Sequence, residues 1–117
     1  MKGMMLFANE FEDIEALGTL DLIRRAKIEI ETVSITGSKQ ILTQSKVNVL
    51  ADKLIEEINL DEYDFLIIPG GAAVMKTHLN SPITESVVNY FYHKSANCWT
   101  MYPDIQANDP DHLAILL

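Results

Sequence analysis

Three consecutive residues, Pro69-Gly70-Gly71, could form an anion-binding turn. They directly follow residues 65–68, a run of four large apolar side chains that is typical of a central parallel strand with both faces covered. Proline lacks a backbone donor and glycine adopts backbone angles closed to other residues, so the strand must turn sharply there. Backbone N–H groups left unpaired in such a turn can hold an oxyanion. The alternative, favoured by these residues alone, is a plain strand-to-helix turn.

Cys98 is the only cysteine, and therefore the only thiol that could act as a nucleophile. Bulky Trp99 follows it and no base lies within sequence reach, which favours a structural role. The histidines show no metal-ligand spacing with one another or with Cys98, and a surface role is the default for His78, His93 and His112. The late acids Asp104, Asp109 and Asp111 lack the glycine and glutamate of a calcium loop. The sequence therefore predicts no metal and no cofactor.

The elements that must position the turn begin with two strands and a helix. Residues 4–8 are apolar and predict a buried strand, while residues 28–35 alternate and are rich in β-branched side chains, which also favours a strand. Between them, apolar residues recur at every third position and predict a helix whose inward side chains are Ile14, Leu17, Leu20, Ile23 and Ala26, with Leu22 beside them. Acidic residues precede this helix and basic residues end it, as the helix dipole prefers.

Further along the chain, residues 41–43 and 47–50 predict an edge hairpin, and residues 51–58 predict a short helix. A loop is expected from Gly71 to Asn80. Ser81-Pro82 is a favoured start for a helix, whose expected buried face is Ile83, Val87, Val88, Phe91 and Tyr92. This order of elements predicts an α/β fold, a doubly wound parallel sheet with flanking helices, in which residues 4–8, 30–35 and 65–68 are adjacent parallel strands.

The net charge and the composition limit the classes of partner and the cellular compartment that we expect for this chain. The net charge of −8 disfavours nucleic acids and anionic membranes, which require clustered lysine and arginine. No apolar run is long enough to span a membrane. A single cysteine cannot form an internal disulfide, so the reducing cytoplasm is the expected compartment.

Five segments together resemble the ThiJ/PfpI superfamily, the group of Parkinsonism-associated protein deglycase-like proteins. They are residues 11–16, 21–26, 33–37, 51–53 and 67–71, in order and with compatible spacing. The resemblance covers Lys2 to about Lys94. It implies a flavodoxin-like fold of the class I glutamine amidotransferase-like type, and a homodimer.

The resemblance also implies a reactive cysteine at a strand-to-helix elbow, which acts on small dicarbonyls or glycated groups. Reported activities are of glyoxalase, deglycase and chaperone-like types, and some members are labelled thiazole monophosphate biosynthesis proteins. Glu15 matches the glutamate that hydrogen-bonds the family's thiolate, and Gly70 and Gly71 match the turn that supplies backbone donors. Without the resemblance, Glu15 is an ordinary first-turn acid favoured by the helix dipole.

The likeness stops abruptly near Lys94. The family's cysteine follows a buried run, in a pattern like Ala-Ile-Cys-Ala-x-Pro, whereas the sequence here is Ser95-Ala96-Asn97-Cys98-Trp99-Thr100. No further buried strand is visible, and Cys98 comes too early after Gly71 for loop, helix and strand. We therefore expect an incomplete, truncated domain over residues 1–94 and a non-matching tail over residues 95–117, for which a frame change or deletion near Lys94 is the simplest cause.

Three functions compete. The first is a glyoxalase- or deglycase-related enzyme whose nucleophile elbow is lost and whose activity is impaired. The second is a non-catalytic dimerising or stress-related, chaperone-like module; the exposed edge of a truncated sheet also predicts a homodimer or larger assembly. The third is a flavin-binding electron carrier. The acidic, glycine-free residues 9–13 offer no phosphate-binding loop after the first strand, which disfavours this third function.

Overall fold

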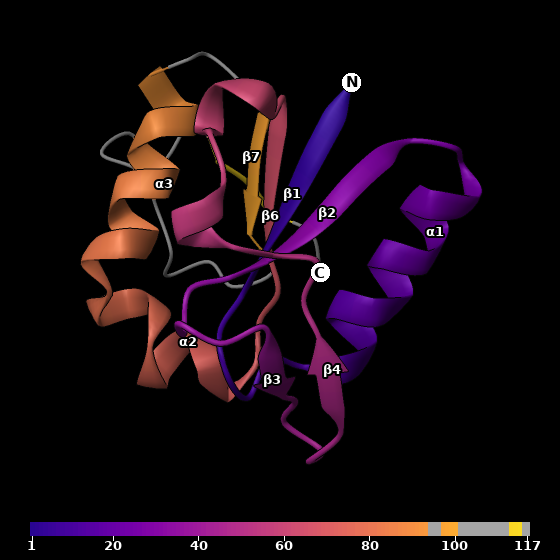
Figure 1. Cartoon of the computed structure of the whole chain (residues 1–117), viewed down its shortest axis with the longest axis vertical. Helices are drawn as coiled ribbons and strands as arrows, with labels where there is room; N and C mark the ends of the chain where they lie inside the picture. Colours follow the sequence, from indigo (N-terminus) through magenta and orange to yellow (C-terminus); the bar gives the residue numbers. More distant parts are fainter. Residues whose placement is uncertain (94–96, 101–112, 116–117) are drawn as a thin grey trace.

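The computed structural model of the chain describes residues 1–93, 97–100 and 113–115. Its strands form a six-stranded parallel sheet in the order β5-β2-β1-β6-β7-β8 (Figure 1). The strands are β1 (Lys2–Phe7), β2 (Glu29–Ser34), β5 (Lys53–Leu54), β6 (Phe65–Ile68), β7 (Asn97–Thr100) and β8 (Leu113–Ile115). β1 pairs with both β2 and β6, so the predicted adjacency of the first three long strands is confirmed.

Helices cover both sides of this sheet. α1 (Thr19–Arg25) lies on one side and α3 (Pro82–His93) on the other (Figure 1). A short helix, α2 (Ala72–Lys76), follows β6. β3 (Gln40–Leu42) and β4 (Asn48–Leu50) form a separate antiparallel hairpin, as expected. The flavodoxin-like α/β fold is thus confirmed, and no helix of the described residues is long and apolar enough to cross a membrane.

The core lies around the two central strands. Every residue of β6 is buried, and the side chains of β1 from Met4 to Phe7 have no exposed surface. Helices on both sides of the sheet explain why the run of apolar residues in β6 has no polar face. Gly3 in β1 leaves room for the Phe65 ring, which lies 2.0 Å from the position that a Cβ at Gly3 would occupy.

The sequence pattern predicts an α-helix from Ile14, but the regular α-helix begins about one turn later. Ile14–Gly18 forms a π-helical turn, and α1 begins only after it. A π turn shifts the helical phase, so Ile14 is 80% exposed and Leu22 67% exposed, whereas Ala16 is buried. The predicted inward positions of Ile14 and Ala26, and of Leu22 beside them, are therefore wrong, since all three residues are exposed. After the helix, Lys27 has a left-handed φ of 62° at the place where the family resemblance implies a glycine.

Three predictions for segments after residue 50 are also wrong. Residues 51–58 form no α-helix: they comprise β5 and a 3₁₀ turn at Ile55–Glu57, because Asp52 anchors the chain beside β2 by accepting the Thr32 N–H at 2.9 Å. The expected loop after Gly71 contains α2 and a 3₁₀ turn at His78–Asn80. In α3, Ile83 is 41% exposed and Thr84 is buried in its place.

The prediction that no strand follows Lys94 is also wrong. β7 pairs in parallel with β6, and β8 pairs in parallel with β7. The short run Asn97–Thr100 has little strand signal of its own, and its pairing with the fully buried β6 is a tertiary effect that a local pattern does not show. The late residues singled out above, Asp104, Asp109, Asp111 and His112, lie outside the described residues.

Candidate functional site

Three loops meet at the carboxyl edge of the sheet, where ligands bind in open α/β folds. They are residues 9–13 after β1, residues 43–47 between β3 and β4, and residues 69–71 after β6. Figure 1 shows the hairpin and α2 at this same end of the sheet. The backbone joins the first loop to the other two, because Glu10 N–H donates to Leu42 O at 2.7 Å and Glu12 N–H donates to Gly70 O at 3.0 Å.

Glu15 and Gly70 are in direct contact. The Gly70 N–H donates to Glu15 Oε2 at 3.0 Å, and the Glu15 N–H donates to Glu12 Oε2 at 2.7 Å. A Cβ on Gly70 would lie 2.6 Å from Glu15 Oε2, so only glycine lets the carboxylate approach the turn. The structure therefore brings together two residues 55 positions apart, and the Gly70 N–H points at a protein carboxylate.

Gly71 has a backbone conformation that a side chain would not tolerate. Its φ is 99° and its ψ is −174°, a region that is essentially restricted to glycine. A Cβ there would lie 2.6 Å from Glu12 N and 2.8 Å from Gln44 Oε1. Gln44 accepts the Ala72 N–H at 2.8 Å, and its own N–H donates to Phe11 O at 2.9 Å. Gln44 thus holds the turn from the hairpin, a role that sequence reasoning missed because no local signal marks it.

Asp13 fixes the hairpin loop to the first loop. Its carboxylate accepts the Thr43 hydroxyl at 2.7 Å, and the Ser45 hydroxyl at 2.6 Å. These hydroxyl groups, Ser45 first, lower the pKa of Asp13. Glu10, which has a left-handed φ of 70°, pairs with Lys76 at 2.9 Å, and this lysine holds the pKa of Glu10 below its ordinary value. Within the described residues, no group of three histidine, cysteine or acidic side chains could hold a metal ion.

Cys98 lies inside β7 and not beyond its end. It pairs in register with Leu66, and the last pair of these two strands is Thr100 with Ile68. The level of Gly70 is therefore four residues further along, about 13 Å if the chain stays extended at about 3.3 Å per residue. A cysteine at an elbow would instead follow the strand. The structure thus assembles Glu15 with the turn and leaves Cys98 within the sheet.

His78 is buried, so its predicted surface role is wrong. Its side chain lies in the 3₁₀ turn before α3, it is 3% exposed, and its Nδ1 lies 2.8 Å from Thr84 Oγ1. Among the described residues its Nε2 has no hydrogen-bond partner. Burial lowers the pKa of His78 to about 4, so the imidazole is neutral at pH 7. His93 at the end of α3 is exposed, as expected.

Comparisons with known proteins agree with this geometry. Deglycase PfpI from Pyrococcus furiosus is 34% identical over 86 residues, which cover 73% of this chain and 51% of the relative. The glutathione-independent glyoxalase DJ-1 from Schizosaccharomyces pombe is 30% identical over 85% of this chain and 55% of its own length. A solved structure of Schizosaccharomyces pombe DJ-1 superposes with a TM-score of 0.76 at 27% identity, over 86% of this chain and 57% of that one.

The chain thus spans about half the length of these relatives. The sequence profile of the DJ-1/PfpI family matches residues 1–99, which include the Glu15–Gly70 contact, the Gly71 turn and strand β7 except for Thr100. The chain therefore belongs to the DJ-1/PfpI family.

Proposed function

We propose that this chain is related in function to the cysteine-dependent glyoxalases and deglycases that act on small dicarbonyls or glycated groups, and that its own turnover is impaired. Support for the class comes from the relatives named as a deglycase and a glyoxalase. The observation on which the impairment rests is the register of β7, which holds Cys98 opposite Leu66 and away from the Glu15–Gly70 contact.

In this proposal Glu15 and the turn are the part of a thiolate site that this chain retains. A carboxylate fixed beside a backbone N–H can orient a thiol or a substrate hydroxyl, and Gly71 would stand beside a developing oxyanion. The neighbouring Gly70 and Ala72 N–H groups already donate to Glu15 and Gln44. Catalysis by a thiolate also requires the sulfur at that point, with a lowered pKa. Cys98 does not meet the first requirement. The proposal further takes the family's cysteine motif to be lost after about Lys94, while the family profile as a whole matches as far as residue 99. We also propose that the chain consists of a family-like domain over residues 1–94 and a tail of different origin over residues 95–117.

The first prediction concerns turnover. Consumption of methylglyoxal, a small dicarbonyl, is expected to be absent or very weak, and the substitution Cys98→Ser is expected to change nothing measurable. Loss of the dicarbonyl absorbance measures the rate, and the Schizosaccharomyces pombe glyoxalase provides a positive control in the same assay. A rate comparable to that control that both Cys98→Ser and Glu15→Gln abolish would contradict the proposal.

The second candidate function is a non-catalytic dimerising or stress-related, chaperone-like module. The observation that favours it is an apolar surface made of Ile14 and Leu22 on the first helix and Val47 and Leu50 on the hairpin, all at least 50% exposed. Asp13, the residue before Ile14, accepts the Ser45 N–H at 3.1 Å and so links the start of the first helix to the hairpin. Exposed apolar patches of this kind mark protein interaction sites.

A homodimer through this surface is the second prediction. Gly18 lies between Ile14 and Leu22 on the helix, and a Cβ there would meet only Ile14, at 4.0 Å, so a second helix could approach closely. We expect a dimer in sedimentation experiments at roughly tens of micromolar, and a monomer for Leu22→Lys. Leu79→Lys replaces a partly exposed leucine outside this surface and should leave the dimer intact. A wild-type monomer, or equal behaviour of the two variants, would argue against the dimer.

From the sequence we further propose that the protein is cytoplasmic, that it works without a cofactor, and that it binds neither nucleic acids nor membranes. The acidic charge of −8 supports the last of these.

A further inference from the structure

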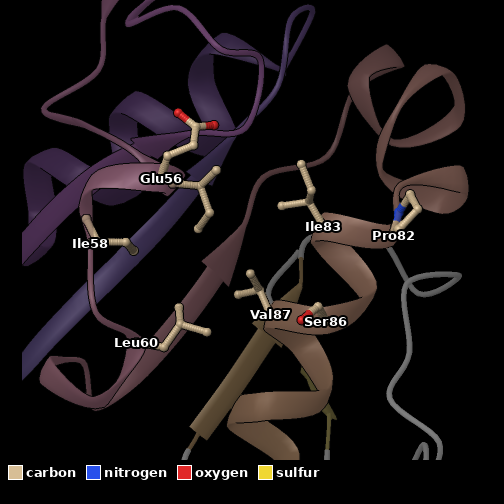
Figure 2. A pocket seen from close by; sticks show the side chains of 8 residues that line it. Glu56, Ile58, Leu60, Pro82, Ile83, Ser86 and Val87 are labelled. Atoms are coloured by element: carbon tan, nitrogen blue, oxygen red, sulfur yellow. The ribbon is translucent and has the colours of Figure 1, made fainter.

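A groove lies between residues 55–60 and the first turns of α3, on a part of the surface that shares no residue with the Glu15–Gly70 site. Its volume is about 490 Å³, and Figure 2 shows the side chains that line it. The lining residues are Ile55, Glu56, Ile58, Leu60, Pro82, Ile83, Ser86 and Val87. Six of these eight side chains are apolar, so the groove offers a mainly hydrocarbon surface with two polar groups.

The packing of α3 explains why this groove remains open. Thr84 is directed into the core, where it bonds His78, and this orientation leaves Ile83 41% exposed on the groove wall. Beyond Leu60 and Val87, the Tyr90 hydroxyl donates to Asp61 and joins the two walls. The groove is therefore lined mainly by aliphatic side chains, as in a small-molecule site.

The two segments that form the groove carry acidic residues and no basic ones. Residues 55–62 and 82–93 contain five acidic residues and no lysine or arginine. Of these acids, Glu57 pairs with Lys39 at 3.7 Å and Asp61 accepts the Tyr90 hydroxyl, whereas within the described part of the chain no hydrogen bond or ion pair holds Glu56. Glu56 lines the groove, so an unneutralised carboxylate stands at the margin of an apolar surface.

We propose that this groove binds a small molecule with an apolar body and a positively charged head, such as an alkylammonium. The volume falls in the range of roughly 300–1,000 Å³ of ordinary ligand pockets. The aliphatic walls would remove the apolar body from water. The Glu56 carboxylate at the margin would attract the cationic head. Fatty acids and other anionic amphiphiles are disfavoured, because the walls present only negative charge. This site is independent of the proposed dicarbonyl chemistry.

The test compares three ligands that have the same six-carbon chain and different heads: hexylammonium, 1-hexanol and hexanoate. Amide chemical shifts of the whole chain are followed by NMR at millimolar ligand concentrations. We expect the shifts to map to residues 55–60 and 82–87, with hexylammonium the tightest, hexanol intermediate and hexanoate the weakest ligand. Hexanoate binding as tightly as hexylammonium, shifts centred elsewhere, or no shift with any of the three would overturn the proposal.

Two variants separate the parts of the site. Glu56→Gln should weaken hexylammonium about two- to fivefold, the range expected for one exposed charge pair, and leave hexanol unchanged. Ile83→Asn should weaken all three ligands, and because Ile83 is 41% exposed the fold should tolerate this change. Ile28→Asn is the matched control after α1, 37% exposed and not among the residues that line the groove, and should affect none. An unchanged hexylammonium affinity in Ile83→Asn would also refute the assignment.

Discussion

Gly71→Ala is expected to lower the free energy of unfolding by about 3 kcal/mol. Part of this loss is backbone strain, because the angles at Gly71, φ 99° and ψ −174°, lie in a region where a side chain costs about 1–3 kcal/mol. The rest is steric, because the new Cβ would lie 2.6 Å from Glu12 N and 2.8 Å from Gln44 Oε1. Movement of either group would break the contacts that hold the turn against the first loop and the hairpin.

Gly37→Ala is the matched control for this change. Gly37 also has a positive φ, 85°, but nothing lies within 4 Å of a Cβ built there. Gly37→Ala should therefore lower the free energy of unfolding only by the cost of placing a side chain at positive φ, about 1 kcal/mol. Urea unfolding of the wild type and the two variants measures both losses. Equal losses would mean that the neighbours of Gly71 yield freely, and that the turn is not held as described.

Stability is expected to fall by about 3 kcal/mol as the pH is lowered from about 6.5 to about 4, because of His78. In the unfolded chain a histidine has a pKa of about 6.5, whereas burial in the folded chain lowers the pKa of His78 to about 4. The unfolded state therefore binds a proton first, and its protonation favours unfolding. The contribution of His78 to stability is complete above pH 6.5 and declines as the pH falls toward 4.

The variant His78→Gln should remove this decline, although its stability at pH 7 can differ from that of the wild type. His93→Gln is the matched control, since His93 is exposed at the end of α3, and it should keep the wild-type slope. Carboxyl groups titrate in the same range, so the difference between the slopes of wild type and His78→Gln is the relevant quantity. Urea unfolding at several pH values measures it. Parallel slopes for all three proteins would show that His78 is accessible to protons in the folded state.

The parts of the fold that sequence patterns predicted are those that a single segment determines. The unbroken apolar run of β6 reflects burial on both faces. The alternation of β2 predicted a strand, although burial alternates only over its first half and Thr32–Ser34 are all buried. The cap that begins α3 was also predictable, because Ser81 Oγ accepts the Thr84 N–H at 3.2 Å within one turn. These signals are local and physical, and they were sufficient to place three parallel strands side by side.

The failures have non-local causes. The π turn at Ile14–Gly18 shifts the phase of an otherwise regular apolar pattern, and β7 depends on the edge that β6 offers. Residues 51–58 have apolar spacing that fits a short helix, yet Asp52 binds the Thr32 N–H and keeps the chain extended beside β2. Burial of His78 results from its contact with Thr84 six residues later, which no spacing rule singles out.

The candidate site was predictable only through the family resemblance. Glu15 and Gly70 are 55 residues apart, and neither residue type shows on its own that they meet. Gln44 was missed because a polar residue in a hairpin loop is ordinary. Its role is evident only from the structure, in which its side-chain oxygen accepts the Ala72 N–H. The position of Cys98 within a strand differs from the irregular tail that the sequence predicted, although both place it away from the turn.

The pH dependence of Cys98 alkylation shows whether its thiol lies beside the Glu15 carboxylate. If Cys98 lies within the sheet and apart from Glu15, iodoacetamide should react slowly at about pH 6. The rate should rise only toward the ordinary thiol pKa of about 8.5, with the same profile in Glu15→Gln. Rapid alkylation at about pH 6 that Glu15→Gln slows would contradict the account, because it would show a thiolate held by the Glu15 carboxylate.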